Sequence, residues 1–553
     1  MDDEQLADSF ADFFADKIDK LSTRCTYQER DVSLPFSNVF LRYSQEEIET
    51  AIDCLKRSRA QGFDEIPGLV IKDLKKVLAL PLCWLFNSIS EYKDIPKAWK
   101  MSRVTPIFKK GNPKDIANYR PVSNVSSLSK VFERTMLIKM MQFSELETLF
   151  GNHQHGFIPN RSVITAALTL QDYISTKLDE NKIVLLYSAD LSAAFDMLRP
   201  DALVEVLVNI GLNPNFIELV YNFLKGRSNY IQVGSASSSV KEVPIGCVQG
   251  SVMGPILFNI YTRKLGELFP PEIFCMAYAD DSYVGVSCNH SDIEGGLETL
   301  SSTASQHYNW LSNMGMVCNK SKTEFIIFDR FKNKKENLTL NIDLDFIKPV
   351  KTMKVIGITF QEDPKWTKHI SKSISSANSM FLPLKYVNKY LNRTQFKSTV
   401  NAHFVSRLTF ASPVWYKSIS GKDLQRIDVN MNRVTRLILR DPKFKGSNRE
   451  LYVRAGVRSL SSACTIANCT MLFKLCTDPR VDPLCVRLML QCRVSDRFPD
   501  SLRFFDFSQT RVGKMSFINR AKQISELITF KWTNLSLPAF KRKIRDRTPL
   551  YIN

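Results

Sequence analysis

The chain has 553 residues, of which 44% are hydrophobic and 24% charged, and this composition is typical of a folded protein and excludes a largely disordered one. This length exceeds what one hydrophobic core usually organises, so roughly three or four domains or subdomains are expected. The formal net charge of +19 favours a polyanionic partner, because each Lys or Arg that neutralises a phosphate releases a counterion; a merely soluble basic protein is the alternative.

Membrane, secreted and zinc-binding classes are not expected. The longest apolar run, residues 77–86, is interrupted by Pro81 and is too short to cross a bilayer. No secretory segment is evident in the acidic start at residues 1–4. The twelve cysteines are scattered, and those of the C-terminal part form no CxxC pair, so reduced thiols in an intracellular protein are the expectation.

Residues 1–100 are expected to form a helical N-terminal extension. Apolar residues recur at helical spacing near the start of the chain, at Leu6, Phe10, Phe13, Phe14 and Ile18. Ser44, followed three residues later by Glu47, predicts a capping box at the start of a further helix. Another helix is expected around residues 77–90.

Residues 101–362 change to a mixed pattern. Strands are expected at 104–108 and 119–123 around a basic turn, at 183–189 directly before Asp190, and as a pair within 273–286 that folds about Asp280-Asp281. The intervening segments predict helices at 129–147, 163–180, 201–224 and 251–265. This alternation predicts an α+β domain built on an antiparallel sheet.

Beyond residue 362 the strands are expected to stop and helices to dominate, in a basic segment at 363–420 and a helical basic C-terminal region at 421–553. The segment 363–420 contains one acid, Asp363, and many cations, namely Lys365, Lys368, Lys372, Lys385, Lys389, Arg393, Lys397, Arg407 and Lys417. Aromatic residues are interleaved with them. Such a surface suits a phosphate backbone, and a solvated helical face explains it equally well.

The acids of the mixed segment suit metal-dependent phosphoryl transfer. That reaction uses two divalent metals held by carboxylates that meet in space. Asp190 at a strand end and Asp280-Asp281 at a hairpin bend can meet, because antiparallel neighbours bring both places to one edge of a sheet. Taken alone, a solvent-facing turn accounts equally well for the Asp pair.

Several short motifs follow one another along this segment, and two of them contain these acids. They are Asn118-Tyr119-Arg120-Pro121-Val122-Ser123 with Lys130 and Glu133, Gly156-Phe157 with Arg161-Ser162, Asp190-Leu191-Ser192-Ala193-Ala194-Phe195-Asp196, Gly246 to Pro255 with Gln249-Gly250-Ser251, Tyr278-Ala279-Asp280-Asp281, Asn319 with Lys322-Thr323, and Val355-Ile356-Gly357-Ile358. In this order the set resembles the reverse transcriptases of non-LTR (LINE-like, jockey-type) retrotransposons. The resemblance covers about residues 40–420 and extends more weakly to the C-terminus.

The resemblance implies a right-hand polymerase fold with fingers and palm at 101–362 and a helical thumb at 363–420, between the N-terminal extension and the C-terminal region. It implies that Asp190 and Asp280 hold two Mg²⁺ ions, with Mn²⁺ as an alternative, and that Asp281 is a weaker ligand. Lys322 would be the acid that protonates pyrophosphate, or else a surface lysine. Asp196 is expected to be a helix-start acid without a chemical role.

The resemblance also implies a set of substrate-binding residues, Lys109, Lys110, Arg120, Phe195, Gln249 and Gly250. The three cations would hold the triphosphate, although the two lysines fit a solvated turn equally well. Gln249 and Gly250 would lie beside the nucleotide and template, with a turn glycine as the alternative for Gly250. Phe195 would lie under the sugar and exclude a 2′-hydroxyl, or else pack in the core. Residues 355–360 resemble the strand that grips the primer, or else pack as an apolar strand.

The function that the resemblance implies is RNA-directed DNA synthesis from dNTPs on a DNA primer and an RNA template. No segment resembles an endonuclease or a ribonuclease H, so a separate endonuclease is a potential partner, and integration implies a nuclear stage. Two alternatives remain open, a viral-type RNA-dependent RNA polymerase and a catalytically inactive, domesticated nucleic-acid-binding protein. The Ala279 and Phe195 positions argue against the RNA polymerase, which usually has Gly and a polar residue there.

Overall fold

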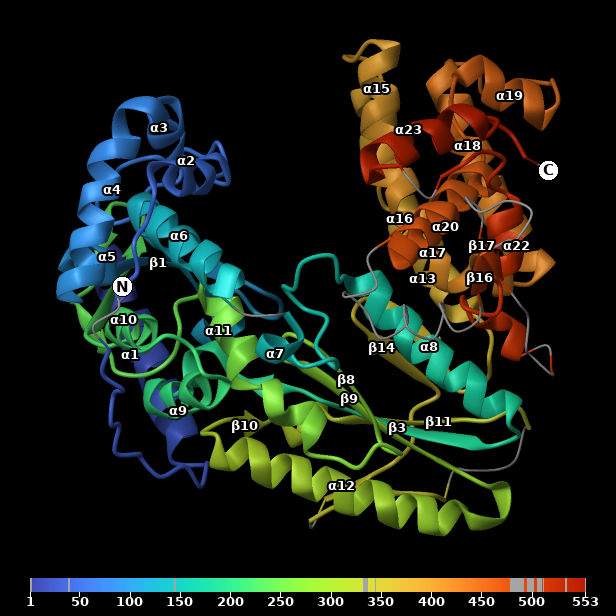
Figure 1. The fold of residues 1–553 in the computed structure, drawn as a ribbon. Coiled ribbons are helices and arrows are strands. Elements are labelled where there is room, and N and C mark those ends of the chain that lie inside the picture. Colours follow the sequence, from blue (N-terminus) through green and yellow to red (C-terminus); the bar gives the residue numbers. More distant parts are fainter. Residues whose placement is uncertain are drawn as a thin grey trace.

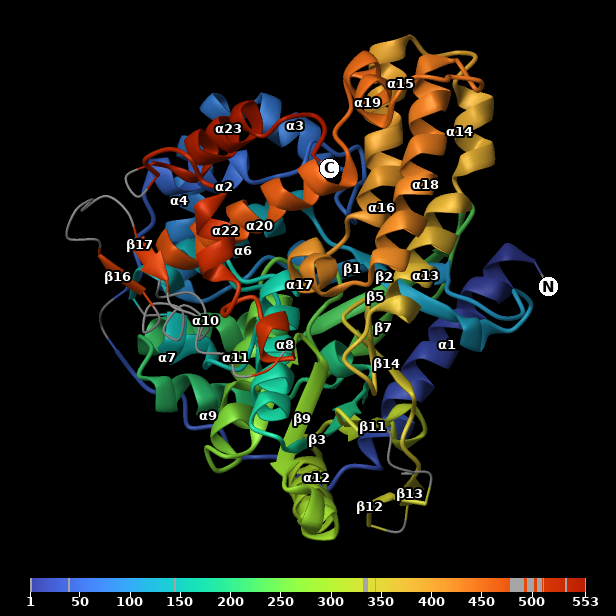
Figure 2. The ribbon, with the colours of Figure 1, turned by 90° about the vertical axis from the view of Figure 1, so that its right-hand side faces the viewer.

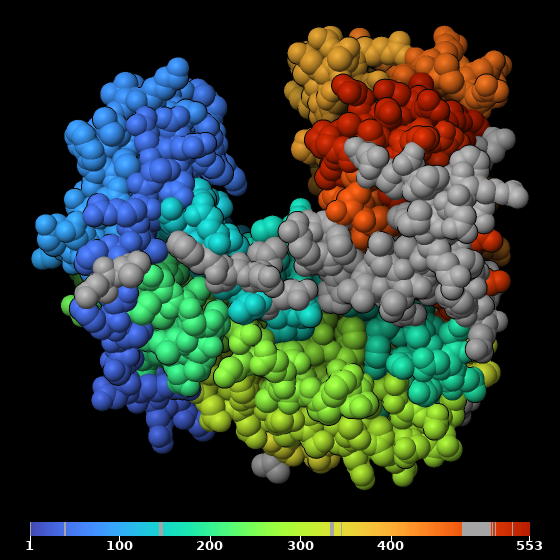
Figure 3. Space-filling model, viewed as in Figure 1, coloured from blue at the N-terminus to red at the C-terminus, as the bar shows by residue number. Residues whose placement is uncertain are grey.

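The computed structural model describes residues 2–37, 40–143, 146–331, 337–343, 345–477, 492–494, 502–504, 510, 512–532 and 535–552. Two arms rise from a common base and leave a wide open channel between them (Figures 1 and 3). The arm at the left of Figure 1 contains the first helices of the chain, and the arm at the right contains the helices that follow the last strands of the base. This is the right-hand arrangement of fingers, palm and thumb that the sequence predicted.

The base of the molecule is a four-stranded antiparallel sheet in the order β11-β3-β9-β8. Alternate residues of β3 face opposite sides: Val184 and Leu186 belong to the core shared with α8, and Leu185 and Tyr187 to the core shared with α12. Because both faces are covered, β3 reads as a continuous apolar run. The elements are β3 (Ile183–Ala189), β8 (Phe274–Tyr278), β9 (Asp281–Cys288), β11 (Glu324–Phe328), α8 (Val163–Asp179) and α12 (Ile293–Asn313).

A second sheet forms the floor of the first arm. The predicted hairpin is confirmed as β1 (Met101–Phe108) antiparallel to β2 (Tyr119–Asn124), and β1 pairs in parallel with β5 (Arg227–Val233). The predicted first helix is α1 (Asp3–Ser22), whose Phe10 packs against Val104 and Ile231 of this sheet. Two short strands complete it, β6 (Ala236–Ser237) and β7 (Lys241–Val243).

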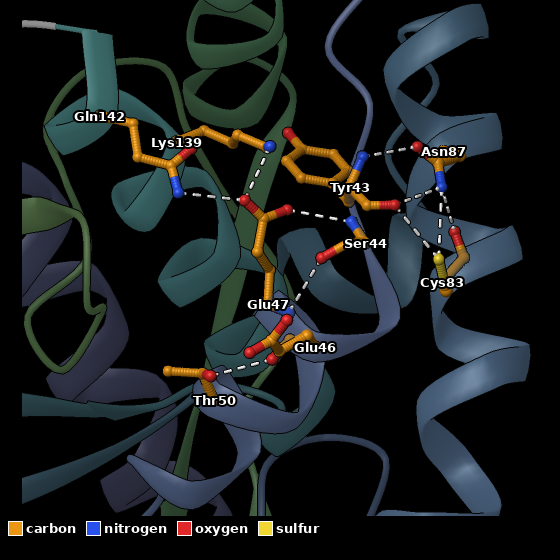
Figure 4. A network of polar contacts seen from close by, with 9 residues as sticks. All are labelled: Tyr43, Ser44, Glu46, Glu47, Thr50, Cys83, Asn87, Lys139 and Gln142. Atoms are coloured by element: carbon orange, nitrogen blue, oxygen red, sulfur yellow. Dashed lines mark hydrogen bonds and ion pairs between the residues drawn. The ribbon is translucent and has the colours of Figure 1, made fainter.

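A polar network joins three helices of the first arm, α2 (Gln45–Asp53), α4 (Lys75–Tyr92) and α6 (Ser127–Phe143) (Figure 4). The predicted capping box is confirmed: Ser44 Oγ accepts from the Glu47 amide at 3.2 Å and the Glu47 carboxylate accepts from the Ser44 amide at 2.9 Å. The same carboxylate pairs with Lys139 of α6 at 2.7 Å. The Tyr43 amide donates to Asn87 of α4 at 2.8 Å, so one short segment ties α2 to both neighbours.

Two predicted helices differ from the observed ones. The helix expected at 201–224 is two helices, because Gly211 (φ 81) ends α9 in a left-handed conformation and Pro214 starts α10. The helix expected at 251–265 begins only at Gly254. The remaining helices of this part are α3 (Gly68–Asp73), α5 (Lys97–Lys100), α7 (Leu146–Phe150), α9 (Pro200–Ile210), α10 (Pro214–Leu224) and α11 (Gly254–Tyr261).

The expected strand at 355–360 is in fact a hairpin of β14 (Thr352–Val355) and β15 (Ile358–Gln361). Its two-residue turn holds Ile356 at φ 46 and Gly357 at φ 88, which matches a type I′ turn. The Ile356 amide donates to Tyr283 Oη at 3.3 Å, which attaches the hairpin to β9. The sequence did not predict the turn because a β-branched residue rarely adopts positive φ.

The second arm is helical: α14, α15 and α18 stand side by side in it, and α16 continues α15 at its lower end (Figure 2). A single buried core runs from α8 of the base through these helices to the C-terminal ones. The helices are α13 (Thr367–Asn378), α14 (Phe381–Val387), α15 (Arg393–Val400), α16 (Ser406–Leu408), α17 (Ser412–Trp415), α18 (Gly421–Leu439), α19 (Asn448–Ala455), α20 (Leu460–Thr477), α22 (Ala521–Glu526) and α23 (Leu537–Arg547).

The expectation that strands stop after residue 362 is wrong at one place. The short strands β16 (Cys492–Val494) and β17 (Leu502–Phe504) pair in antiparallel fashion between α20 and α22. A further small hairpin, β12 (Leu340–Ile342) and β13 (Asp345–Ile347), lies at the base. The division of the chain at residues 100, 362 and 420 stays a prediction. Within the described ranges no helix combines the length and the apolar character needed to cross a bilayer.

Candidate active site

The three predicted carboxylates meet at one edge of the palm sheet. Ala189 at the end of β3 pairs with Ser282 of β9, so Asp190 follows directly beside the turn that carries Asp280 and Asp281. The β8–β9 hairpin closes with Tyr278 opposite Asp281, which leaves a two-residue turn. The convergence that the sequence predicted from antiparallel neighbours is thus present.

These acids are partly buried and repel one another. Burial, and next the charge of Asp190, raises the pKa of Asp280 above its usual value. Burial, followed by the charges of Asp280 and Asp190, raises the pKa of Asp281 to about 6. Gathering acids in this way costs free energy that a bound cation recovers, because an opposite charge favours the ionised form.

The donor set fits a divalent oxygen-seeking cation. Within the described residues, the structure contains no cage of three or more His, Cys, Asp or Glu side chains. Mg²⁺ usually binds through one or two protein carboxylates and takes its other ligands from substrate phosphates and water. Asp190 and Asp280 are therefore the residues that would hold such an ion.

Lys322 lies at the same edge, as predicted. The short strands β4 (Leu191–Ser192) and β10 (Val317–Cys318) pair just beyond Asp190, and the Asn319 amide donates to the Asp190 carbonyl at 2.7 Å. This pairing brings Lys322 Nζ to 2.8 Å from Asp190 Oδ2. Lys322 is thus an exposed lysine that pairs with Asp190, and its role as an acid stays a prediction.

Three predicted cations of the fingers hairpin are exposed: Lys109 and Lys110 lie in the turn after β1, and Arg120 lies on β2. Lys109 is near enough for its charge to lower the pKa of Asp280, against the larger effect of burial. Lys110 and Arg120 are exposed to solvent on the same hairpin. Of these three predicted cations, the structure therefore brings Lys109 near the acids. Lys110 and Arg120 remain candidates for binding the triphosphate from the fingers hairpin.

A glycine is required at position 250 because the backbone of β2 approaches it closely. It has φ 109, and a Cβ atom there would lie 2.4 Å from the carbonyl oxygen of Ser123 on β2. The Ser123 amide donates to the Gln249 carbonyl at 3.2 Å, so the loop lies directly against the fingers strand. No other residue type fits without moving one of the two.

Asp196 has a contact that the sequence did not suggest. It lies in the short helix η2 (Ala194–Met197), as a helix-start acid should, and its carboxylate accepts from Gln249 Nε2 at 3.3 Å. Burial raises the pKa of Asp196 to about 6, while Lys17 of α1 and the Gln249 hydrogen bond lower it. Asp196 therefore orients the side chain of Gln249.

Phe195 is half-buried at the turn after Asp190, with its ring centroid 4.9 Å from that of Phe258 on α11. Its carbonyl accepts from the Cys247 amide at 2.8 Å. The packing alternative is therefore partly true, since one side of the ring contacts the core. The part of the ring that remains exposed keeps the predicted role at the nucleotide sugar open.

Glu133 stands in the sequence only as part of a motif, yet it holds the loop that follows Gly250. The residue is fully buried on α6, and its carboxylate accepts from the amides of Val252 and Met253 at 2.6 and 3.0 Å and from Ser251 Oγ at 2.5 Å. These bonds use the first amides before α11, which explains why this helix starts later than expected.

We expect Glu133→Gln to destabilise the protein by about 2 kcal/mol, because a neutral amide oxygen is a weaker acceptor than the carboxylate for the buried donors of Ser251, Val252 and Met253. The thermal midpoint of the purified chain should fall by several degrees. Glu267→Gln is the control, since Glu267 is exposed and contacts Arg263 at 3.5 Å on the surface. Equal midpoints for both variants would contradict the role given to Glu133.

The candidate site thus consists of a carboxylate edge on an antiparallel sheet, near a basic hairpin and beside a helical arm. This arrangement suits metal-dependent nucleotidyl transfer. Residues 107–360 match the family described as "Reverse transcriptase (RNA-dependent DNA polymerase)". Residues 107–360 are therefore similar to reverse transcriptase domains, and the relatives that match include RNA-directed DNA polymerases of mobile elements such as jockey, in agreement with the resemblance of the motifs.

Two relatives illustrate this. The "Probable RNA-directed DNA polymerase from transposon BS" of Drosophila melanogaster is 24% identical over 80% of this chain and 50% of its own length. The "RNA-directed DNA polymerase from mobile element jockey" of the same fly is 25% identical over 62% of this chain and 37% of its own length. The chain thus spans half or less of these relatives.

Solved structures of telomerase from Candida tropicalis also match. The apo form has a TM-score of 0.37 at 11% identity and covers 68% of this chain and 66% of its own. The complex with a fragment of telomeric RNA has a TM-score of 0.32 at 13% identity and covers 70% of this chain and 65% of its own.

Proposed function

We propose that this chain synthesises DNA on an RNA template by transferring nucleotides from dNTPs to a primer 3′-hydroxyl. The observation that carries the proposal is the meeting of Asp190 with the Asp280-Asp281 turn at the palm edge, within a segment that matches reverse transcriptases. Figure 3 shows an open channel between the two arms above the base, and a template-primer duplex would occupy this channel.

Asp190 and Asp280 would hold two Mg²⁺ ions, or Mn²⁺ in their place. When bound, such ions neutralise the charge that develops on phosphate and activate the attacking hydroxyl. Asp281 supports the pair from the start of β9. Reverse transcriptases generally need divalent metals; that this chain uses two ions, and that they are Mg²⁺ or Mn²⁺, is proposed here.

The surrounding side chains bind and orient the nucleotide. Lys109, Lys110 and Arg120 offer positive charge to the triphosphate from the fingers hairpin, and Arg suits phosphate through its planar fork of donors. Gln249, oriented by Asp196 at 3.3 Å, contacts the incoming nucleotide. Lys322, whose Nζ lies 2.8 Å from Asp190 Oδ2, would act as the acid that protonates the departing pyrophosphate.

The direct test is primer extension. Purified protein, a DNA primer annealed to RNA, Mg²⁺ and dNTPs should give extended primer on a gel, and NTPs should give little. Asp280→Asn is the matched inactive control. Extension with NTPs as efficient as with dNTPs would instead support an RNA polymerase, and RNA binding without any extension would support a non-catalytic binding protein.

The second arm would grip the template-primer duplex through four lysines of α13, α14 and the turn after it. Lys368, Lys372, Lys385 and Lys389 are exposed, and no carboxylate of the described residues lies within ion-pair distance of them. Lys365, also predicted for this surface, pairs with Asp363 at 2.8 Å and contributes less.

Replacing these four lysines by alanine should weaken template-primer binding and reduce the slope of log K against log salt by about three to four, roughly 0.9 for each phosphate that is no longer neutralised. The control removes four exposed lysines spread over other elements, Lys76, Lys97, Lys264 and Lys522. If both variants have the same slope as the wild type, the four lysines form a solvated face.

The proposal also includes a nicking activity from a separate endonuclease and a nuclear stage at integration, since the copied DNA must reach chromosomal DNA. Both parts rest on the resemblance to retrotransposon polymerases. Cell fractionation of a tagged chain tests the nuclear stage.

A further inference from the structure

The turn that presents Asp280 has an unfavourable backbone. Ala279 lies in the left-handed region at φ 57, which residues with a Cβ atom rarely adopt. Such a conformation persists only where neighbouring groups hold it. The direction of the Asp280 and Asp281 side chains therefore depends on whatever holds Ala279.

Gln154 holds it from a neighbouring segment. This side chain is 1% exposed, and its Oε1 accepts from the Ala279 amide and from the Gly156 amide, each at 2.8 Å. Its Nε2 donates to the Ala279 carbonyl at 3.3 Å. One side-chain amide thus satisfies both backbone groups of the left-handed residue.

The segment around Gln154 is itself held against β8. The His155 amide donates to the Ala277 carbonyl at 2.8 Å, and the Ala277 amide donates to the His153 carbonyl at 2.8 Å, as in a parallel strand pair. Arg161 Nη1 donates to the Gln154 carbonyl. The Gln154 side chain therefore has little freedom to leave the turn.

Gly156 makes this closeness possible. A Cβ atom at this position would lie 2.4 Å from the Ala279 amide nitrogen, a distance that real Cβ atoms do not show. Asn259 Nδ2 of α11 donates to the Gly156 carbonyl at 2.6 Å and fixes the other side of the segment. The motif glycine that the sequence singled out thus serves the turn of the metal-binding acids.

We infer that Gln154 is a positioning residue, which sets the left-handed Ala279 turn and so aims the Asp280 carboxylate at the metal site. The inference rests on the proposed function for the meaning of that site. The hydrogen bonds of the Gln154 side chain go to backbone groups of Ala279 and Gly156, so Gln154 acts through the backbone of the residue before Asp280.

Hydrogen exchange tests the hold on the turn without any catalytic activity. In Gln154→Met, which keeps the length of the side chain and removes its hydrogen bonds, peptides covering residues 274–284 should exchange the Ala279 amide about tenfold faster. Gln171→Met is the matched control: Gln171 is also buried, on α8, and lies outside this turn. Its exchange over 274–284 should equal that of the wild type.

Metal binding and kinetics test the consequence. The dissociation constant for Mn²⁺ alone, read by electron paramagnetic resonance, should rise about tenfold in Gln154→Met, as expected when the hydrogen bonds that support a ligand are removed. The kcat of primer extension should fall by a similar factor, with KM for dNTP and Kd for template-primer within about twofold. If Gln154 had only a structural role, the variant would have a lower thermal midpoint, but its kcat would not fall selectively while KM and Kd stay nearly unchanged.

A second variant covers the case in which Gln154→Met does not fold. Gly156→Ala leaves Gln154 intact and pushes the segment from the turn, so it should speed Ala279 exchange and weaken Mn²⁺ binding in the same direction. Wild-type exchange and Mn²⁺ affinity in folded variants would overturn the inference. A wild-type protein that extends no primer would overturn the proposed function alone, since exchange and Mn²⁺ binding still decide the role of Gln154.

Discussion

Replacing Asp190 or Asp280 by asparagine should lower the kcat of primer extension by about a thousandfold or more. The change removes a negative charge and leaves the shape of the side chain nearly unchanged. It withdraws several kcal/mol of transition-state stabilisation that metal-bound carboxylates supply. Both acids lie at the palm edge, Asp190 after the end of β3 and Asp280 in the β8–β9 turn, so both variants should behave alike.

The measurement is single-turnover extension on primed RNA, with template-primer binding measured in parallel. Binding should stay within about twofold, because neither acid belongs to the basic surfaces that bind phosphate. Asp292→Asn is the control, since Asp292 lies in the turn before α12 and is exposed. Near-normal synthesis by either active-site variant would remove these acids from the metal site.

Phe195→Val should raise the use of ribonucleotides relative to deoxynucleotides by about a hundredfold, because it removes a steric clash of a few kcal/mol with the 2′-hydroxyl. The ring is half-buried and rests on Phe258 at 4.9 Å between centroids. Its smaller replacement should therefore also cost some packing, on the order of 1–3 kcal/mol. The two effects are separable, since only the first changes the ratio of kcat/KM values.

The ratio of kcat/KM for dNTP and rNTP on the same primed RNA decides the role of Phe195. Phe216→Val is the matched control, because Phe216 is buried in the same core on α10 and lies outside the candidate site. It should lower stability and leave the ratio unchanged. An unchanged ratio in folded Phe195→Val would make Phe195 a packing residue and favour the RNA polymerase alternative.

The sequence by itself predicted the similarity to reverse transcriptases and the local elements that carry the acids. The apolar run at 183–189 was long enough to predict β3, which is observed. The hairpin bend predicted at Asp280-Asp281 is also present, one residue earlier, at Ala279-Asp280, so that Asp281 begins β9. The Ser44–Glu47 capping box was equally readable, because its two hydrogen bonds join residues three positions apart. Patterns of this kind depend on neighbours along the chain, which a sequence displays directly.

Tertiary structure decided the contacts between distant segments. The Glu133 carboxylate meets amides near residue 252, and Gln154 meets Ala279, across 119 and 125 positions of the chain; no local pattern marks such partners. Backbone conformations at positive φ, as at Ala279 and Ile356, were also invisible, since they are unfavourable locally and exist only because long-range hydrogen bonds hold them. The residue types needed for the chemistry were thus readable from the chain, whereas the groups that aim them were decided by packing.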